Sequence, residues 1–209
     1  MQRDVIANGV VVAGIVGPGE PFVDVVGFVA PAGQVTLVPT DPGTSQVALA
    51  LAVGGRVRLA AGSITVGGVP DADLRRLRTR LVDLVDVTSP EESLSLRAVV
   101  AEELALAERP ASRRDVSTFL ADRRLEDRAR VRWGSLPAGL RTRLLLELAA
   151  RHRDVRVLVL AGPDRHGGDP REWHRAATGL ADRGLTVIAL CSPSTVDVLS
   201  AHIVEKASA

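Results

Sequence analysis

Short apolar runs separated by glycine and proline dominate the first third of the chain. Most of these runs are rich in valine, a β-branched residue that favours strands, and their turn-forming boundaries keep each run to strand length. One apolar stretch follows a turn-rich segment and is closed by Gly54 and Gly55, which indicates a helix. The elements expected here are strands at 5–12, 22–29, 34–38, 56–59 and 63–66 and a helix at 45–53.

The middle of the chain changes to helical and charged patterns. Residues 96–108 alternate apolar and acidic side chains at helical spacing. Residues 109–132 hold eight arginines against four acidic residues and few large apolar ones, which is typical of a solvated, loosely packed helical lobe. We expect helices at 71–80, capped by Asp71, and at 96–108, a strand at 81–87, and a helical lobe at about 95–135.

The last third alternates helices with strands that are almost entirely apolar. Helices at 140–151 and 171–183 alternate with strands at 155–160 and 185–190. Strands that alternate with helices form a parallel sheet covered on both faces, so the pattern predicts an α/β fold. The length of 209 residues fits a single domain over 1–209.

Composition narrows the classes of function. The 26 lysines and arginines against 25 acidic residues leave a net charge of +1, so no overall field attracts nucleic acid. Tyrosine is absent and phenylalanine occurs three times, too rarely for a platform on which bases stack. The single cysteine suits a reducing compartment, and the four histidines lack the spacing of metal ligands. No segment reaches the roughly 18 apolar residues that a membrane span needs. We therefore expect a cytoplasmic protein with no nucleic-acid partner, no metal site and no direct membrane insertion.

Five segments carry motifs in a characteristic order. They read PAGQVTLV (31–38), LPAGLRTRL (136–144), VLVLAGP (157–163), GDP (168–170) and GLTVIALCS (184–192). In this order they resemble parts of the nucleotide-binding domain of ATP-binding-cassette (ABC) transporters. These parts are the strand before the phosphate loop, the signature, the Walker B strand, the D-loop and the switch segment. The resemblance implies a P-loop NTPase-like fold with an antiparallel β-arm and a short helical lobe.

The segment 39–47 aligns with the phosphate loop of this family. A phosphate loop uses glycine-rich backbone, a lysine that reaches the phosphates and a Ser/Thr hydroxyl on Mg²⁺. The alignment places Ser45 at the lysine and Gln46 at the Mg²⁺ ligand, and the only lysine of the chain, Lys206, lies far away in the sequence. The weak candidates for holding an anion at this helix N-terminus are Gly43, Thr44 and Ser45.

The other chemical positions of the family differ as well. Ala161 and Gly162 stand where the resemblance expects the aspartate that binds Mg²⁺ and the glutamate that polarises water. Ser192 stands at the switch histidine, and Pro137 at the signature serine. Asp164 lies beyond the proline that follows both carboxylates in the family pattern. These differences predict that neither ATP nor Mg²⁺ is a cofactor.

The resemblance and the missing groups together predict an ABC transporter ATP-binding-protein-like subunit that is a catalytically inactive pseudo-ATPase. The resemblance implies an integral membrane permease-like subunit, a second ABC subunit, or both as partners. Such a partner would hold the chain at the inner face of the plasma membrane. The implied docking cleft spans 88–97, and the candidate contacts are Glu91, Glu92, Leu94, Leu96 and Val99.

Two other functions stay open at this point. One is a divergent but working ATPase subunit whose catalytic groups come from a partner, against which the missing lysine argues. The other is a soluble interaction module that uses the ABC fold away from any transporter. A neighbouring gene for a polytopic membrane protein would favour docking over the soluble module.

Overall fold

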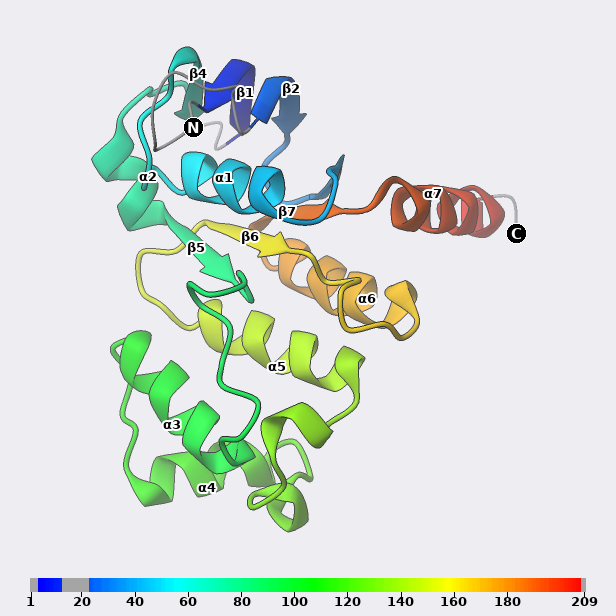
Figure 1. Ribbon diagram of the computed structural model, residues 1–209. Coiled ribbons are helices and arrows are strands. Elements are labelled where there is room, and N and C mark those ends of the chain that lie inside the picture. The colour runs from blue at the N-terminus through cyan, green and yellow to red at the C-terminus, as the bar shows by residue number, and fades with distance from the viewer. Residues whose placement is uncertain (1–3, 13–22, 208–209) are drawn as a thin grey trace.

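The computed structural model describes residues 4–12 and 23–207 (Figure 1). The first half of the chain contains β1 (Val5–Val12), β2 (Val23–Ala30), β3 (Val35–Pro39), α1 (Thr44–Val53), β4 (Ala61–Val66), α2 (Ala72–Arg78), β5 (Thr79–Val82) and α3 (Leu96–Leu106). The second half contains α4 (Arg113–Ala121), the 3-10 helices η1 (Glu126–Arg128) and η2 (Trp133–Ser135), α5 (Ala138–Ala149), β6 (Val157–Ala161), α6 (Pro170–Ala181), β7 (Thr186–Cys191) and α7 (Pro193–Ala207).

Four parallel strands in the order β3-β7-β6-β5 form the central sheet. Every residue of β6 and β7 is buried, because helices cover both faces of the sheet. This double burial explains why the two strands read as almost continuous apolar runs. The expectation that 34–38, 155–160 and 185–190 form neighbouring parallel strands is confirmed.

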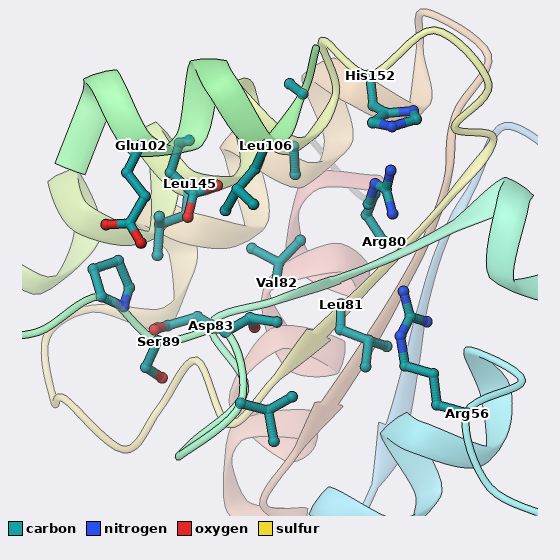
Figure 2. A pocket seen from close by; sticks show the side chains of 16 residues that line it. Arg56, Arg80, Leu81, Val82, Asp83, Ser89, Glu102, Leu106, Leu145 and His152 are labelled. Carbon is teal, nitrogen blue, oxygen red and sulfur yellow. The ribbon is translucent and has the colours of Figure 1, made fainter.

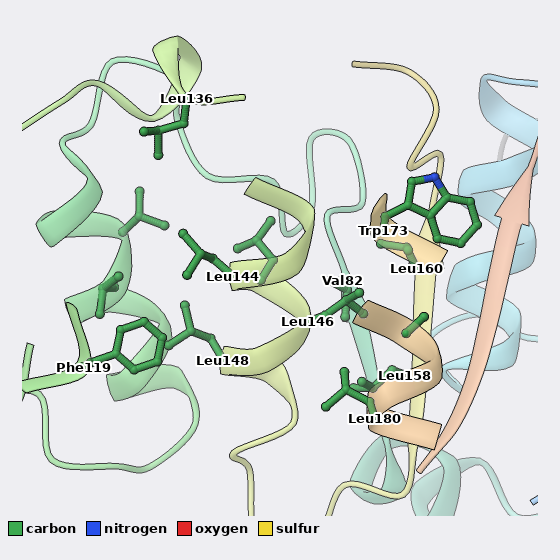
Figure 3. Packing of buried hydrophobic residues seen from close by; sticks show 14 of the residues in the cluster. Val82, Phe119, Leu136, Leu144, Leu146, Leu148, Leu158, Leu160, Trp173 and Leu180 are labelled. Atoms are coloured by element: carbon green, nitrogen blue, oxygen red, sulfur yellow. The ribbon is translucent and has the colours of Figure 1, made fainter. Parts of the chain in front are cut away.

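Alternate residues of β6 belong to two separate hydrophobic cores. Val157 and Val159 pack in the core that contains α1. Leu158 and Leu160 pack in the core that contains α5 and α6, where Figure 3 shows Leu160 beside Trp173 and Leu158 beside Leu180. The period of two along the strand therefore divides its side chains between the two faces of the sheet.

A second sheet is antiparallel, with the order β2-β1-β4. It lies at the far end of the molecule from α3 and α4, and α1 packs between it and the central sheet (Figure 1). This sheet is the β-arm that the resemblance implies.

The arginine-rich helical lobe is packed more tightly than its composition suggests. Val116, Phe119 and Leu120 of α4 recur at i, i+3 and i+4, and all three are buried. They share one core with Leu144 and Leu148 of α5 (Figure 3). The prediction of a loosely packed lobe is therefore wrong, because a narrow apolar stripe suffices to anchor a helix whose other faces are charged.

The expected strand at 56–59 is absent. The backbone N–H of Arg56 donates to the carbonyl of Leu51 (2.8 Å), and its side chain donates to the carbonyl of Gly54 (2.9 Å). Residue 56 therefore completes the turn that ends α1 and does not enter a sheet.

The boundary between α2 and β5 also differs from the expectation. Asp71 caps the helix as predicted, since its side chain accepts from the N–H groups of Asp73 (2.7 Å) and Leu74 (3.2 Å). However, β5 takes the last two residues of the expected helix and ends at Val82. Asp83 then adopts a φ of +59°, which turns the chain away from the sheet before the expected strand 81–87 is complete.

The helix α7 was not expected from the sequence pattern. It extends away from the central sheet toward the C-terminus (Figure 1). Within 4–12 and 23–207, no helix combines the length and apolar character needed to cross a membrane.

Candidate nucleotide site

The predicted site positions meet at the carboxyl ends of the parallel strands, the edge at which open α/β sheets bind ligands. Thr40, which follows β3, donates its backbone N–H to the last residue of β7 (2.9 Å), and Gly162, which follows β6, donates to the carbonyl of Leu190 (2.9 Å). Gln46, Gly162 and Ser192 line one cavity of about 420 Å³. Ala161 is buried and Ser45 is exposed, and neither of them lines this cavity.

The N-terminus of α1 carries no side-chain cap. Gly43 precedes the helix with φ +113° and ψ −146°, a backbone conformation that requires glycine. Thr44 and Ser45 are exposed in the first turn, which contains no acidic residue. The positive end of the helix dipole therefore faces solvent. Ser45, at the position of the family's lysine, adds no positive charge to it.

Gln46 is buried and uses its amide to hold the site together. Its Nε2 donates to Thr40 Oγ1 (3.1 Å) and to the carbonyl of Leu190 (3.2 Å). These bonds tie the start of α1 to the loop after β3 and to β7. An amide nitrogen is a hydrogen-bond donor and is not a ligand for Mg²⁺, which prefers oxygen.

Gly162 fits against this amide because it has no side chain. Its φ is +62°, and a Cβ atom at this position would lie 2.7 Å from Gln46 Oε1. Any larger residue would therefore require both a strained backbone and a displaced glutamine. The residues at 46 and 162 are adapted to each other.

Asp164 is the carboxylate nearest to the expected Walker B end, but it is engaged in capping α7. Its Oδ2 accepts from the backbone N–H of Ser192 (2.8 Å) and from Thr195 Oγ1 (3.0 Å). Burial alone raises the pKa of Asp164, but the hydrogen bonds from Ser192 and Thr195 outweigh it and the net pKa is lowered. Asp164 is thus an ionised carboxylate committed to the start of a helix.

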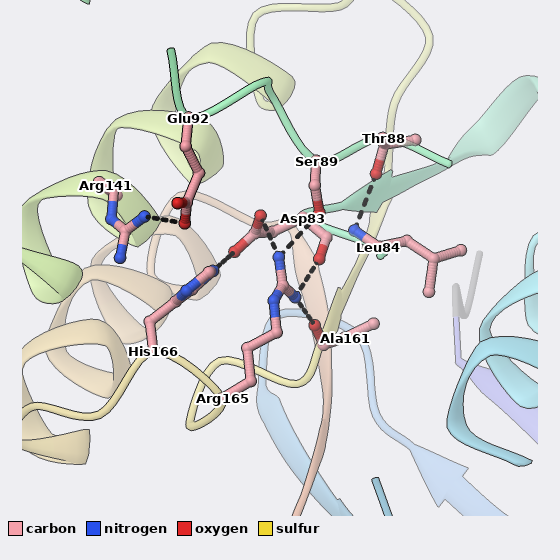
Figure 4. Close-up of polar contacts among 9 residues, drawn as sticks. All are labelled: Asp83, Leu84, Thr88, Ser89, Glu92, Arg141, Ala161, Arg165 and His166. Atoms are coloured by element: carbon pink, nitrogen blue, oxygen red, sulfur yellow. Dashed lines mark hydrogen bonds and ion pairs between the residues drawn. The ribbon is translucent and has the colours of Figure 1, made fainter. Parts of the chain in front are cut away.

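A buried ion-pair cluster lies beside this cavity (Figure 4). Asp83, which is 3% exposed, receives Nη2 of Arg165 at 2.6 Å and faces Nε2 of His166 at 3.4 Å. Arg165 also donates to Ser89 Oγ (2.8 Å), to the carbonyl of Ala161 (2.9 Å) and to the carbonyl of Asp83. One guanidinium group therefore joins the loop after β5 to the loop after β6.

Sequence reasoning missed this cluster. Asp83 and Arg165 are 82 positions apart, and Asp83 was expected inside a strand. The sequence does contain one signal, a charged residue directly after an apolar strand. If such a residue is buried, it needs a partner of opposite charge.

The structure corrects two of the predicted docking residues. Leu96 and Val99 are fully buried in the core of the helical lobe, and Leu94 packs against that core. Leu96 and Val99 lie in the first turn of α3 and hold that helix to the protein's own core, so they are not available to a partner. Glu91 and Glu92 are exposed, and Glu92 pairs with Arg141 at 3.5 Å.

A groove of about 310 Å³ separates β5 from α3 and α5 (Figure 2). Arg56, Arg80 and His152 lie toward one end of it, whereas Glu102 lies toward the other. Glu103 also lines the groove, and burial raises its pKa to about 7, with further contributions from the nearby Glu102 and Asp83 carboxylates.

The raised pKa of Glu103 predicts a pH-dependent stability. The unfolded chain releases this proton near its usual pKa of 4.5, whereas the folded chain keeps it until about pH 7. Stability should therefore fall as the pH rises through this interval. Between pH 5 and pH 8, we expect the wild type to lose about 2 kcal/mol more free energy of unfolding than Glu103→Gln. Urea denaturation at both pH values measures this, with the exposed Glu126→Gln as control. Equal losses in the wild type and Glu103→Gln would contradict the assignment.

Neither a metal site nor a reactive thiol is evident in the described ranges. They contain no group of three His, Cys, Asp or Glu residues placed to hold a metal ion. Burial raises the pKa of Cys191 to about 12, so its thiol stays protonated and has little nucleophilic character.

Comparison with solved structures identifies proteins of the same fold. An ABC transporter ATP-binding protein from Pyrococcus furiosus is 14% identical, with 90% of both chains covered and a TM-score of 0.66. A nucleotide-free ATP-binding cassette from an ABC transporter is 16% identical, with 96% of this chain and 85% of that chain covered and a TM-score of 0.64. An ATP-binding cassette of an ABC transporter in its ADP conformation is 15% identical, with 92% and 82% covered and a TM-score of 0.62. No protein-family model and no curated protein sequence matches the chain. The α/β fold of ABC ATP-binding domains, predicted from the sequence, is confirmed.

Proposed function

We propose that this chain is an ABC ATP-binding-type subunit that does not hydrolyse ATP and that acts by binding a protein partner. The observation that carries this proposal is the hydrogen-bonded contact of Gln46 with Thr40 and Leu190, closed against Gly162. This contact occupies the place where the resemblance expects the Mg²⁺ ligand and the catalytic carboxylate. The protein uses that space for its own packing.

The chemistry of the neighbouring residues supports the same conclusion. Transfer of a phosphoryl group needs Mg²⁺ and a cation on the phosphates, together with a group that orients water. Ser45 supplies no charge, Ala161 and Gly162 supply no carboxylate, and Asp164 is held by the start of α7. The residues present do not fit Mg-ATP as a cofactor.

The partner surface that we propose is the groove between β5 and α3. Val87 and Leu106 line it and are 51% and 64% exposed, so both apolar side chains are accessible to a partner. They replace Leu96 and Val99 as the apolar contacts. The partner classes are an integral membrane permease-like subunit or a second ABC subunit, because the similar structures are described as parts of ABC transporters.

Membrane retention in the native cell tests this function. We expect the chain to sediment with membranes or to co-purify with a second cassette, and Val87→Asp with Leu106→Asp to reduce the retained fraction about tenfold or more. Leu77→Asp is the matched control, since Leu77 is 46% exposed on α2 and does not line the groove. A chain that is only a soluble monomer would contradict the proposal and favour the soluble interaction module.

A further inference from the structure

A second, larger cavity of about 850 Å³ is lined mainly by arginine. Eight of its sixteen lining residues are arginines, although the whole chain of 209 residues has only 26 lysines and arginines together. They come from the connection after α3, the segment after α4, α5, the connection to β6, α6 and the turn before β7. We call this cavity the arginine hollow.

The arginines of the hollow greatly outnumber its acidic groups. Among the described residues that line it, Glu147 is the only acidic one, and it is shared by Arg123 at 2.6 Å and Arg143 at 3.8 Å. Within the described part of the chain, none of the other six arginines forms an ion pair within 4.0 Å. Arg109 donates to the carbonyl of Arg151 (2.7 Å), and such backbone bonds leave the positive charge uncompensated.

The electrostatics of individual groups reflect this excess of positive charge. Partial desolvation lowers the pKa of Arg151, and the neighbouring Arg123 guanidinium lowers it further, against the opposing effect of Glu147. Like charges are therefore held together at a cost that a bound anion would relieve.

A buried histidine at the edge of the hollow lacks hydrogen-bond partners among the described residues. The side chain of His152 is 6% exposed and lines both the hollow and the groove beside β5. Both of its ring nitrogens are buried and have no hydrogen-bond partner within the described ranges, and the Glu108 carboxylate lies 3.8 Å from Nε2. A buried polar atom without a partner is costly, and a ligand in the hollow that reached His152 would relieve that cost.

The hollow lies at the opposite edge of the sheet from the candidate nucleotide site. Val155 and Arg156 precede β6, and Arg183 and Leu185 precede β7, so the hollow lies at the amino ends of these strands. The nucleotide site of this fold lies at the carboxyl ends. The two sites are therefore separate.

We propose that the arginine hollow binds a compact ligand that carries two or more linked phosphate groups. Planar guanidinium groups bind phosphate oxygens in pairs, and several of them surround the cavity. Its lining residues, taken over the described ranges, include no phenylalanine, tyrosine or tryptophan. The ring of nearby Phe119 is covered by Arg123 at 3.7 Å and by Arg151 at 5.1 Å. The hollow thus offers phosphate contacts without a platform for stacked bases, which favours a polyphosphate over single-stranded nucleic acid.

Calorimetric titration of the full chain with tripolyphosphate at low salt tests this proposal. The test variant replaces Arg153, Arg175 and Arg183 by glutamine, because these side chains are exposed and form no ion pair within the described part of the chain. The control variant replaces Arg114, Arg128 and Arg130, which are exposed outside the hollow, and it removes the same charge. We expect the test variant to weaken binding about tenfold or more, and the control to change it less than about twofold.

Two further readouts make the outcome decisive. The ring resonances of His152 should shift on binding in the wild type, which a loosely attracted ion would not produce. Equal affinity in both variants, or binding of orthophosphate as tight as that of tripolyphosphate, would overturn the proposal. Binding of duplex DNA or of anionic phospholipid vesicles without any binding of tripolyphosphate would also overturn it, in favour of an extended polyanion surface.

Discussion

Replacing Arg165 by leucine should lower the free energy of unfolding by about 3–5 kcal/mol, the usual cost of leaving a buried charge without its partner. Asp83 is 3% exposed, and Arg165 provides its 2.6 Å ion pair as well as bonds to Ser89 and Ala161. Urea denaturation monitored by circular dichroism measures the loss.

Two comparisons separate the buried pair from a general effect of charge. Arg171→Leu breaks the 3.6 Å ion pair with Asp169, in which the Arg171 and Asp169 side chains are 43% and 47% exposed. It should lower the free energy of unfolding by at most about 1 kcal/mol. Adding Asp83→Asn to Arg165→Leu should restore at least about 1 kcal/mol, because the uncompensated charge is removed and asparagine tolerates the φ of +59°. If Arg165→Leu costs no more than Arg171→Leu, the cluster does not contribute to the fold as described.

Replacing Gly162 by alanine should cost about 2–4 kcal/mol. The φ of +62° accounts for about 1–2 kcal/mol, and displacement of Gln46 Oε1, 2.7 Å from the new Cβ, accounts for the rest. Gly167→Ala is the matched control, since its φ is +68° but no atom lies within 4 Å of its Cβ position. It should show the backbone cost alone.

A double-mutant cycle with Gln46→Ala isolates the contact between the two residues. The combined variant should be more stable than the sum of the single effects predicts by about 1 kcal/mol or more, since alanine at 46 removes the clashing oxygen. Additive effects would show that Gln46 and Gly162 do not press on each other, and would remove the structural basis for calling them mutually adapted.

Much of the fold could be predicted from the sequence because strands that are buried on both faces of a sheet are apolar at nearly every position. The strands around Leu158 and Ile188 read as apolar runs, and the order of motifs identifies the family fold. Boundaries were harder where a single hydrogen bond or dihedral angle decides them, as at Arg56 and Asp83. Helix α7 was missed because its start depends on Asp164, which comes from a distant loop.

For the candidate site too, the sequence predicts which residues are present but not how they contact one another. The missing lysine is a property of the sequence, and the identities of Gln46 and Gly162 follow from the alignment. Their contact depends on three-dimensional distances and has no sequence signal. Likewise, a net charge of +1 hides the arginine hollow, because its arginines come from six separate segments. Leu96 and Val99 were predicted as partner contacts although they are core residues, because helical spacing does not distinguish a core face from a docking face.

The most direct test of the central proposal is calorimetric titration with Mg-ATP, using the chain in which Arg153, Arg175 and Arg183 are glutamine so that the hollow does not contribute. We expect no binding tighter than about 1 mM, equivalent to roughly −4 kcal/mol, because Ser45 supplies no charge for the phosphates and Ala161 and Gly162 supply no carboxylate for Mg²⁺. A micromolar dissociation constant in this variant would contradict the proposal that the nucleotide site has been given over to the protein's own packing.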